Sequence, residues 1–279
     1  MLNNIGLSAI SLFMAFGALA AQSSIIEPPT LNTALIQGAL IHGNIPANST
    51  IKKSGKTLKT TPDGGFVFGL DREHDEILTL TVSHKKKHAT FKYHVLQRKY
   101  RTQSIKGVAQ KYVAPPQSRL DRIANENKQV KAARQQMTPH TYYLSAPLMP
   151  AKGRITGVYG SQRIFNGTPK RPHYGLDIAA PVGTPVVAPF DGAVSLSHNN
   201  MYYSGGTLII DHGMGVSSTF IHLDKIHVKQ GDIITQGQHI ANIGATGRVT
   251  GPHLDWRINW LNTRLDPALL FTHLPSEIK

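Results

Sequence analysis

The chain has 279 residues, which is long enough for one large domain or two ordinary domains with buried cores. It has no cysteine, which excludes disulfides, thiolate zinc sites and a cysteine nucleophile, so any bound metal must use histidine and carboxylate ligands. The formal net charge of +14 favours polyanionic surroundings. The basic residues are scattered, and no helix-turn-helix, RNP or zinc-finger pattern is present. We therefore expect an anionic cell envelope, and not nucleic acid, around this protein.

An uncharged apolar run occupies residues 5–21 and ends in the small-x-small pattern Ala-Leu-Ala at 18–20. This pattern is typical of a cleaved signal peptide, although no lysine or arginine precedes the run. The alternative is an uncleaved anchor, because the run approaches the length of a membrane span. In either case the rest of the chain is predicted to act in the periplasm or otherwise exported to the cell envelope. After signal cleavage we expect no stable membrane span.

Short apolar runs and turn signals follow each other through residues 34–98. The run at 78–82, Leu-Thr-Leu-Thr-Val, alternates strictly, and Pro-Asp-Gly-Gly at 62–65 is a turn signal. The pattern predicts a small all-β, sandwich-like domain. Three lysines at 85–87 fall at a predicted loop, where they form either a solvated hairpin tip or a binding site.

The segment 118–137 is polar and basic apart from a narrow helical stripe of Leu120, Ile123 and Val130. Ser118, together with an aspartate three residues later, offers an N-terminal capping pattern. Because a narrow stripe buries little surface, we predict a connecting helix packed on a neighbouring element. Coiled-coil pairing is the alternative, for which the segment is short.

In residues 145–272 glycine and proline are frequent and β-type runs return. This composition predicts an antiparallel β domain with almost no helix, so the chain as a whole is predicted to be mainly β. The expected divisions are a signal peptide at 1–20, a linker at 21–33, the small all-β domain at 34–98, a linker at 99–144 that contains the helix, the second β domain at 145–272, and a tail at 273–279.

Strict alternation marks the segment 253–260. The apolar set is Leu254, Trp256, Ile258 and Trp260, and the polar set is His253, Asp255, Arg257 and Asn259. A period of two residues places these sets on opposite faces of one strand. One face can bury two indoles, while the other presents an imidazole, a carboxylate and a guanidinium. Such a set suits metal chemistry if another segment supplies further ligands.

A second polar constellation is His173 and Asp177, four residues apart. Pro172 and Gly175 discourage a helix here, so we expect an extended segment on which His173 and Asp177 share a face and Gly175 leaves room between them. Imidazole and carboxylate ligands suit zinc, although this pair alone is a weak signal. A third candidate is His222, at the polar end of an apolar run, where a histidine can also be purely structural.

Together these segments resemble the lysostaphin/LytM-type zinc metallopeptidases, which cut peptide cross-links of bacterial peptidoglycan. The motifs that carry the resemblance are H-Y-G-L-D at 173–177, P-V-G-T-P-V at 181–186, T-F-I-H-L at 219–223, G-D-I-I-T-Q-G-Q at 231–238 and T-G-R-V-T-G-P-H-L at 246–254. The resemblance covers residues 157–270. It implies a LytM-type peptidase domain with the duplicated hybrid motif, Zn²⁺ as cofactor and peptidoglycan stem peptides as partners.

The resemblance also implies roles for single residues. His173 and Asp177 would bind zinc, while His222 and His253 would act on the attacking water and the transition state. Asp255 stands where the family has its third ligand, the second histidine of H-x-H. An aspartate can ligate zinc, but a second carboxylate makes the site formally neutral and weakens the pull on bound water. Arg257 could offset this effect, or could pair with Asp255 and keep it off the metal.

The leading hypothesis is an exported zinc metalloendopeptidase that acts on peptidoglycan. One alternative is a catalytically weak or inactive relative that binds cell wall or regulates another wall hydrolase; another is an envelope protein whose basic surface binds anionic polymer. The retained set of His173, Asp177, His222 and His253 favours the enzyme, because a regulator has no physical need for four polar residues converging on one groove. Asp255 argues the other way. A regulatory partner in the envelope is open.

Overall fold

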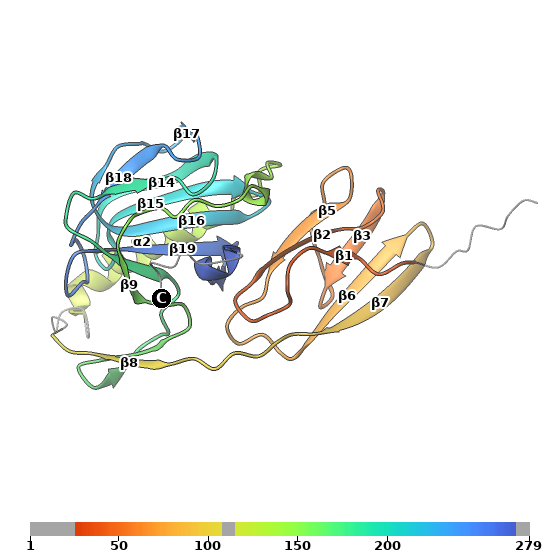
Figure 1. Ribbon diagram of the computed structural model, residues 1–279, viewed down its shortest axis with the longest axis horizontal. Helices are drawn as coiled ribbons and strands as arrows, with labels where there is room; N and C mark the ends of the chain where they lie inside the picture. The colour runs from red at the N-terminus through yellow and green to blue at the C-terminus, as the bar shows by residue number, and fades with distance from the viewer. Residues whose placement is uncertain (1–25, 108–114, 272–279) are drawn as a thin grey trace, which may run out of the picture.

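The computed structural model describes residues 26–107 and 115–271 (Figure 1). The predicted signal peptide and the tail at 273–279 lie outside these ranges. Two β domains and one α-helix account for the described residues, so the predicted mainly β fold class is confirmed. None of the helices in the described ranges is long and apolar enough to cross a bilayer.

The N-terminal domain consists of two antiparallel sheets, in the orders β1-β2-β5 and β4-β3-β6-β7. Its strands are β1 (Thr30–Leu31), β2 (Leu40–Asn44), β3 (Ser49–Lys53), β4 (Lys56–Thr57), β5 (Gly65–Gly69), β6 (Ile77–His84) and β7 (Lys87–His94). Side chains of both sheets, among them Ile41, Phe68 and Leu80, are fully buried in one core. The alternation predicted at 78–82 lies in β6, where every second side chain points into this core. The lysines at 85–87 lie at the β6–β7 turn, where Lys85 has a φ of 54°.

The segment that follows the N-terminal domain is held by strand pairing. Its strand β8 (Thr102–Ile105) pairs in parallel with β10 (Gln162–Phe165), and β11 (Thr168–Pro169) completes a small sheet. Figure 1 shows β8 running from the N-terminal domain to the edge of the second domain. Strand β8, which lies within the predicted linker 99–144, therefore packs against the second domain.

The helix α2 (Leu120–Arg134), preceded by the 3-10 turn η1 (Gln117–Arg119), packs on strands of the second domain. Val130 contacts that domain, as the predicted stripe requires, whereas Leu120 stays 38% exposed. Two buried polar residues also dock the helix: Glu126 accepts the Tyr202 backbone N–H at 2.8 Å, and Arg134 donates to a threonine hydroxyl. The capping pattern predicted from Ser118 is wrong, because no side chain caps either α2 or η1.

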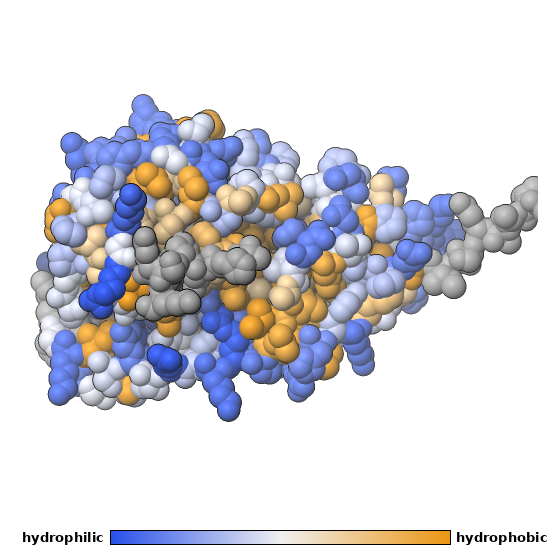
Figure 2. Space-filling view, in the orientation of Figure 1, coloured by the Kyte–Doolittle hydropathy of each residue, from blue (hydrophilic) through white to orange (hydrophobic). Residues whose placement is uncertain are grey.

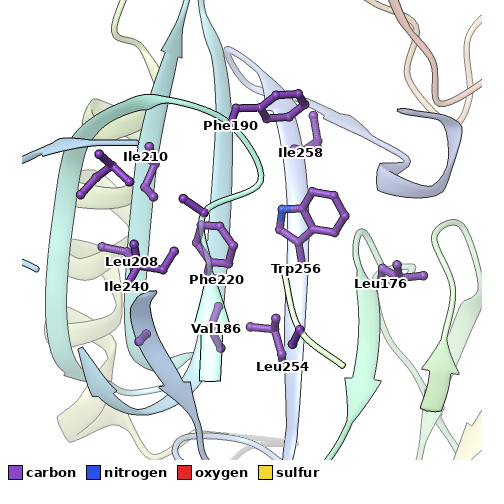
Figure 3. Close-up of a cluster of buried hydrophobic side chains, with 14 of the residues drawn as sticks. Leu176, Val186, Phe190, Leu208, Ile210, Phe220, Ile240, Leu254, Trp256 and Ile258 are labelled. Atoms are coloured by element: carbon purple, nitrogen blue, oxygen red, sulfur yellow. The ribbon is translucent and has the colours of Figure 1, made fainter. Parts of the chain in front are cut away.

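The second domain is built on a large antiparallel sheet with the order β17-β14-β15-β16-β19-β12-β9 and with β13, β18 and β20 attached to its sides. The elements are β9 (Arg154–Gly157), β12 (Leu176–Ala179), β13 (Pro185–Val187), β14 (Gly192–Met201), β15 (Gly205–Gly213), β16 (Val216–Ile226), β17 (Ile233–Ile234), β18 (His239–Ile243), β19 (His253–Trp260), β20 (Thr263–Leu265) and the 3-10 turns η2 (Tyr142–Leu144) and η3 (Pro267–Leu270). The pair β13–β18 contributes Val186 and Ile240 to the core on one face of the sheet (Figure 3).

Strand β19 lies inside this sheet, between β16 and β12. Its side chains alternate as predicted: Leu254, Trp256 and Ile258 are fully buried in the core, while Trp260 is only half-buried (Figure 3). The polar face is not solvated, since Asp255 is also buried, at 1% exposure. A buried carboxylate is expensive unless it is paired, so Asp255 must have a charged or hydrogen-bonding partner on this face.

The surface of both domains is mostly hydrophilic on the face shown in Figure 2, with smaller apolar areas between the polar side chains. Large exposed apolar residues are spread over the described chain, from Ile77 in the N-terminal domain to Ile233 in the second. Such scattered residues are ordinary for a folded chain and mark no interface by themselves.

Candidate active site

The structure brings three candidate ligands together. His173 precedes β12, Asp177 lies in β12, and Asp255 lies opposite it in β19, where the two aspartates are register partners. One ligand atom from each residue lies within 4.8 Å of the others, and all three residues are buried. His173 Nε2 is 3.1 Å from Asp177 Oδ1, and its Nδ1 is 4.0 Å from Asp255 Oδ2. Two segments that are about 80 residues apart in sequence thus form one cluster because their strands pair.

The donor set of this cluster fits a divalent metal ion. Both ring nitrogens of His173 and Oδ1 of Asp177 are buried and make no well-formed hydrogen bond among the described residues, although Nε2 and Oδ1 lie 3.1 Å apart. Buried polar atoms are rarely left unpaired, because each such atom loses its hydration without compensation. A cation between these atoms would satisfy them, and one imidazole with two carboxylates is a ligand set that zinc accepts.

Two glycines make room for the carboxylates. A Cβ at Gly175 would lie 2.1 Å from Asp255 Oδ1, and a Cβ at Gly157 would lie 2.2 Å from Asp177 Oδ2. Real Cβ atoms do not approach oxygen so closely, so any side chain at either position would displace a candidate ligand. Gly175 therefore leaves room across the strands, for Asp255; the room predicted between His173 and Asp177 stays a prediction.

The loop that carries His173 is tied to the N-terminal domain. The backbone N–H of His173 donates to Ser161 at 2.8 Å, and its carbonyl accepts from the Gly160 N–H at 2.8 Å. The Gly160 carbonyl in turn accepts from Arg72 Nε at 2.8 Å. Arg98 adds an ion pair to Asp266 at 2.8 Å across the same interface. The small domain thus supports the backbone of a candidate ligand.

Asp255 is held by an arginine. Arg257 donates from Nε to Oδ1 at 2.9 Å and from Nη2 to Oδ2 at 2.5 Å, which is a bidentate contact. Burial by itself raises the pKa of Asp255, but Arg257 and His173 outweigh it and hold the pKa of this carboxyl well below its usual range. The carboxylate is therefore charged at all physiological pH values. Each of its oxygens retains a second lone pair for another partner.

Asp177 also has an arginine partner, which the sequence did not single out. Arg163 of β10 donates to its Oδ2, so Oδ1 remains on the side of His173. Burial raises the pKa of Asp177, yet the nearby His173 and Arg163 lower it more, and the net pKa lies below the usual range. One oxygen is thus fixed by the protein, and the other is available to a cation.

The two remaining candidates, His222 and His253, lie beside this cluster with their ring centroids 4.9 Å apart. His222 donates from Nδ1 to the Thr246 carbonyl at 2.9 Å, and His253 donates from Nδ1 to the Gly251 carbonyl at 2.9 Å. These bonds leave Nε2 of each neutral ring as an acceptor. His253 Nε2 is 3.9 Å from Asp177 Oδ1.

The backbone at His222 is unusual. This residue of β16 has a φ of 69°, in the left-handed region that costs a non-glycine residue energy. Its N–H donates to the Ser204 carbonyl at 2.8 Å, outside the regular strand ladder. The irregularity turns the ring out of the alternation of the strand and into the site. Burial lowers the pKa of His222 to about 4, so the ring is neutral at physiological pH.

A cavity of about 180 Å³ opens beside these histidines. It is lined by Gln103, Ile105, Thr156, Arg163, Phe165, Asp177, His222, Arg248, Val249, Thr250 and His253. Sequence reasoning did not find Gln103, Arg163 or Arg248 as members of the site. Arg248 lies inside the quoted motif at 246–254, so its place in that motif was the available signal. Gln103 and Arg163 come from the β8–β10 pair, for which the sequence holds no local signal.

The chain is similar to known peptidases in sequence and in structure. The sequence profile described as "Peptidase family M23" matches residues 171–267. Two curated relatives from Vibrio cholerae are the peptidoglycan DD-endopeptidases ShyA, 40% identical over 109 residues, and ShyB, 43% identical over 121 residues. The matches cover 39% and 43% of this chain, but only 25% and 28% of the relatives, so the chain spans about a quarter of their length.

A solved structure matches over both domains. It is a Pseudomonas aeruginosa protein described as a candidate M23 peptidase, with a TM-score of 0.67 and 26% identity; the match covers 85% of this chain and 95% of that one. The N-terminal domain and the second domain thus occur together in another chain. The predicted resemblance is confirmed: residues 171–267 match the profile of peptidase family M23.

Proposed function

We propose that this protein is an exported, zinc-dependent endopeptidase that cleaves peptide cross-links of bacterial peptidoglycan. The observation that carries the proposal is the buried cluster of His173, Asp177 and Asp255, with its unpartnered ligand atoms, beside His222 and His253. The M23 relatives named peptidoglycan DD-endopeptidases support the substrate class. The apolar run at 5–21 supports export, since peptidoglycan lies outside the cytoplasm.

The residues that would hold zinc are His173, Asp177 through Oδ1, and Asp255. When bound, zinc polarises the scissile carbonyl and lowers the pKa of a coordinated water. The chain itself supplies two imidazoles whose Nε2 atoms can accept a proton or, once protonated, donate to an oxyanion. Their Nδ1–H groups are fixed on the Thr246 and Gly251 carbonyls, so the rings cannot present the other nitrogen. Either of the two histidines suits either role.

The domain divisions support this function. We propose that residues 34–98 serve as a small β domain and residues 145–272 as the peptidase domain. The linker between them contains the helix and also β8, whose Gln103 and Ile105 line the cavity. We propose that its partners are peptidoglycan stem peptides and not nucleic acid.

One observation favours the alternative of a weak or inactive wall-binding relative. Both carboxylates of the cluster already have an arginine partner, Arg163 on Asp177 and Arg257 on Asp255. Arg257 contacts both oxygens of Asp255 and would compete there with a metal ion, whereas Arg163 contacts only Oδ2 of Asp177. A family member of this kind would bind cell wall without cutting it.

Digestion of purified peptidoglycan decides between the two functions. Zinc-loaded protein is expected to release peptide fragments with newly exposed termini, detected by mass spectrometry, and a chelator should stop the release until zinc is restored. If the protein sediments with peptidoglycan but releases no fragments at any zinc concentration, the non-catalytic alternative holds.

The role of Asp255 is tested by zinc titration of three variants. If Asp255 is a ligand, Asp255→Ala should weaken zinc affinity by more than about 10²-fold, which exceeds the effect typical of an outer partner of a ligand, while Asp255→His should still bind. Arg257→Ala should then have a smaller effect. Activity of the His variant should extend to lower pH, because one more unit of positive charge at the metal favours ionised water. An unchanged affinity in Asp255→Ala, matched by Arg257→Ala, would exclude Asp255 as a ligand.

A further inference from the structure

Arg248 has no role in the proposed chemistry, yet it lies in the wall of the site. It is part of the loop between β18 and β19 and lines the same cavity as His222 and His253. Its backbone N–H donates to the Tyr203 carbonyl at 2.9 Å. The same loop provides the Thr246 carbonyl that holds the His222 ring. A cationic side chain is thus placed by the loop that orients a candidate catalytic histidine.

The guanidinium of Arg248 is held by two aromatic rings. Its central carbon is 4.7 Å from the ring centroid of Tyr203 and 5.0 Å from that of Phe165. Ring contacts use the faces of the planar group and leave the N–H donors at its edge available. Within the described ranges of the chain, this guanidinium has no ion pair and no side-chain hydrogen bond. It is therefore fixed in place but lacks an anionic partner.

The surroundings of Arg248 favour an anion. Among the described residues that line the cavity, Asp177 is the only acidic one, and Arg163 contacts it. With a divalent ion bound, Asp177 and Asp255 together balance the charge of the metal. The charges of Arg163 and Arg248, which line the cavity, and of Arg257 beside it then remain uncompensated. A substrate group that enters this cavity therefore binds most favourably if it is negatively charged.

We propose that Arg248 is a specificity-determining residue that binds a free carboxylate of the peptide substrate, carried within one residue of the scissile bond. The inference rests on the proposed endopeptidase function and narrows its substrate class. The planar fork of an arginine fits a carboxylate with two parallel hydrogen bonds, which a carboxamide cannot accept in the same way. A substrate with a carboxamide at this position leaves the guanidinium without its charged partner, which costs about 10- to 100-fold in kcat/KM.

The test uses two synthetic stem-peptide dimers that differ only at the residue next to the scissile bond, with a free carboxylate in one and a carboxamide in the other. Zinc-loaded wild-type protein should cleave the acid with a kcat/KM about 10- to 100-fold higher than the amide. In Arg248→Gln this ratio should fall close to one. Lys229→Gln, which removes an exposed charge outside the cavity, should keep the wild-type ratio. Equal rates on both dimers in the wild type overturn the inference.

Binding measurements separate this inference from the proposed function. The same two dimers, with the scissile amide N-methylated, are titrated into wild-type protein and Arg248→Gln. If the wild type cleaves neither dimer but binds the acid more tightly, and Arg248→Gln does not, the endopeptidase proposal fails and the carboxylate site stands. If the wild type binds both equally, the site is refuted whatever the activity. Arg248→Lys keeps the positive charge but loses the planar guanidinium, so it should retain only part of the preference for the acid dimer. This second variant keeps the test valid if Arg248→Gln does not fold.

Discussion

The variant His173→Ala is expected to bind no zinc under conditions in which the wild type binds one ion per chain. The remaining ligands would be Asp177 and Asp255, and two carboxylates alone make a poor tetrahedral set. Both of them also have an arginine partner, and the one on Asp255 contacts both of its oxygens. Metal analysis after zinc-supplemented purification, with titration against a chromophoric chelator, measures the loss directly.

A matched control keeps this result specific. His227→Ala removes an exposed imidazole of the same domain. This ring is not part of the ligand cluster and hydrogen-bonds to Asn242. It should bind one zinc as the wild type does, and both variants should melt cooperatively without metal. If the wild-type protein contains no zinc after zinc-supplemented purification, the assignment of His173 as a ligand is wrong.

Loss of either candidate catalytic histidine is expected to have the second large effect. His222→Ala and His253→Ala should each keep zinc, because neither ring belongs to the ligand cluster. Each should lose on the order of 10²-fold or more in the rate of peptidoglycan cleavage, since removal of a general base or an oxyanion donor typically costs that much. Near-normal turnover in either variant, with zinc content verified, removes that residue from the mechanism.

The pH dependence adds a check on His222. Burial lowers its pKa to about 4 in the folded protein, so the depressed value favours the neutral ring. A neutral acceptor is then present above about pH 5, and protonation of His222 should not limit cleavage between there and neutrality. The measurement is the pH–rate profile of the wild type and of His253→Ala. If the rate of both falls tenfold per pH unit just below pH 7, a group other than His253 sets the acid limit.

Much of the fold could be predicted because its signals are local. The alternation at 253–260 predicted strand β19 and its buried face, and Leu254, Trp256 and Ile258 are buried in the observed core. The same period of two predicted the N-terminal sheets. The helix and its packing on a neighbouring element were predicted from the narrow stripe, but the polar contacts of Glu126 and Arg134 were not, because an apolar stripe does not record them.

The candidate site was predictable where a motif carried it and not elsewhere. His173, Asp177, His222, His253 and Asp255 were singled out from sequence, and the structure brings all of them together. The arginine at 163 was missed because its contact with Asp177 depends on how distant strands pair. The backbone conformation of His222 could not be predicted from the sequence either, because its left-handed φ accompanies an irregular pairing with a neighbouring strand.

The parallel pairing of β8 with β10 has a consequence for anyone who isolates the peptidase domain. A fragment that starts at residue 145 looks natural from the sequence, yet it discards β8 and with it Gln103 and Ile105 of the cavity wall. Strand β10 would then expose an unpaired edge, an open template for association with other chains. We expect such a fragment to have a wider cavity and a tendency to aggregate. Any activity measured on it would describe the fragment and not the protein.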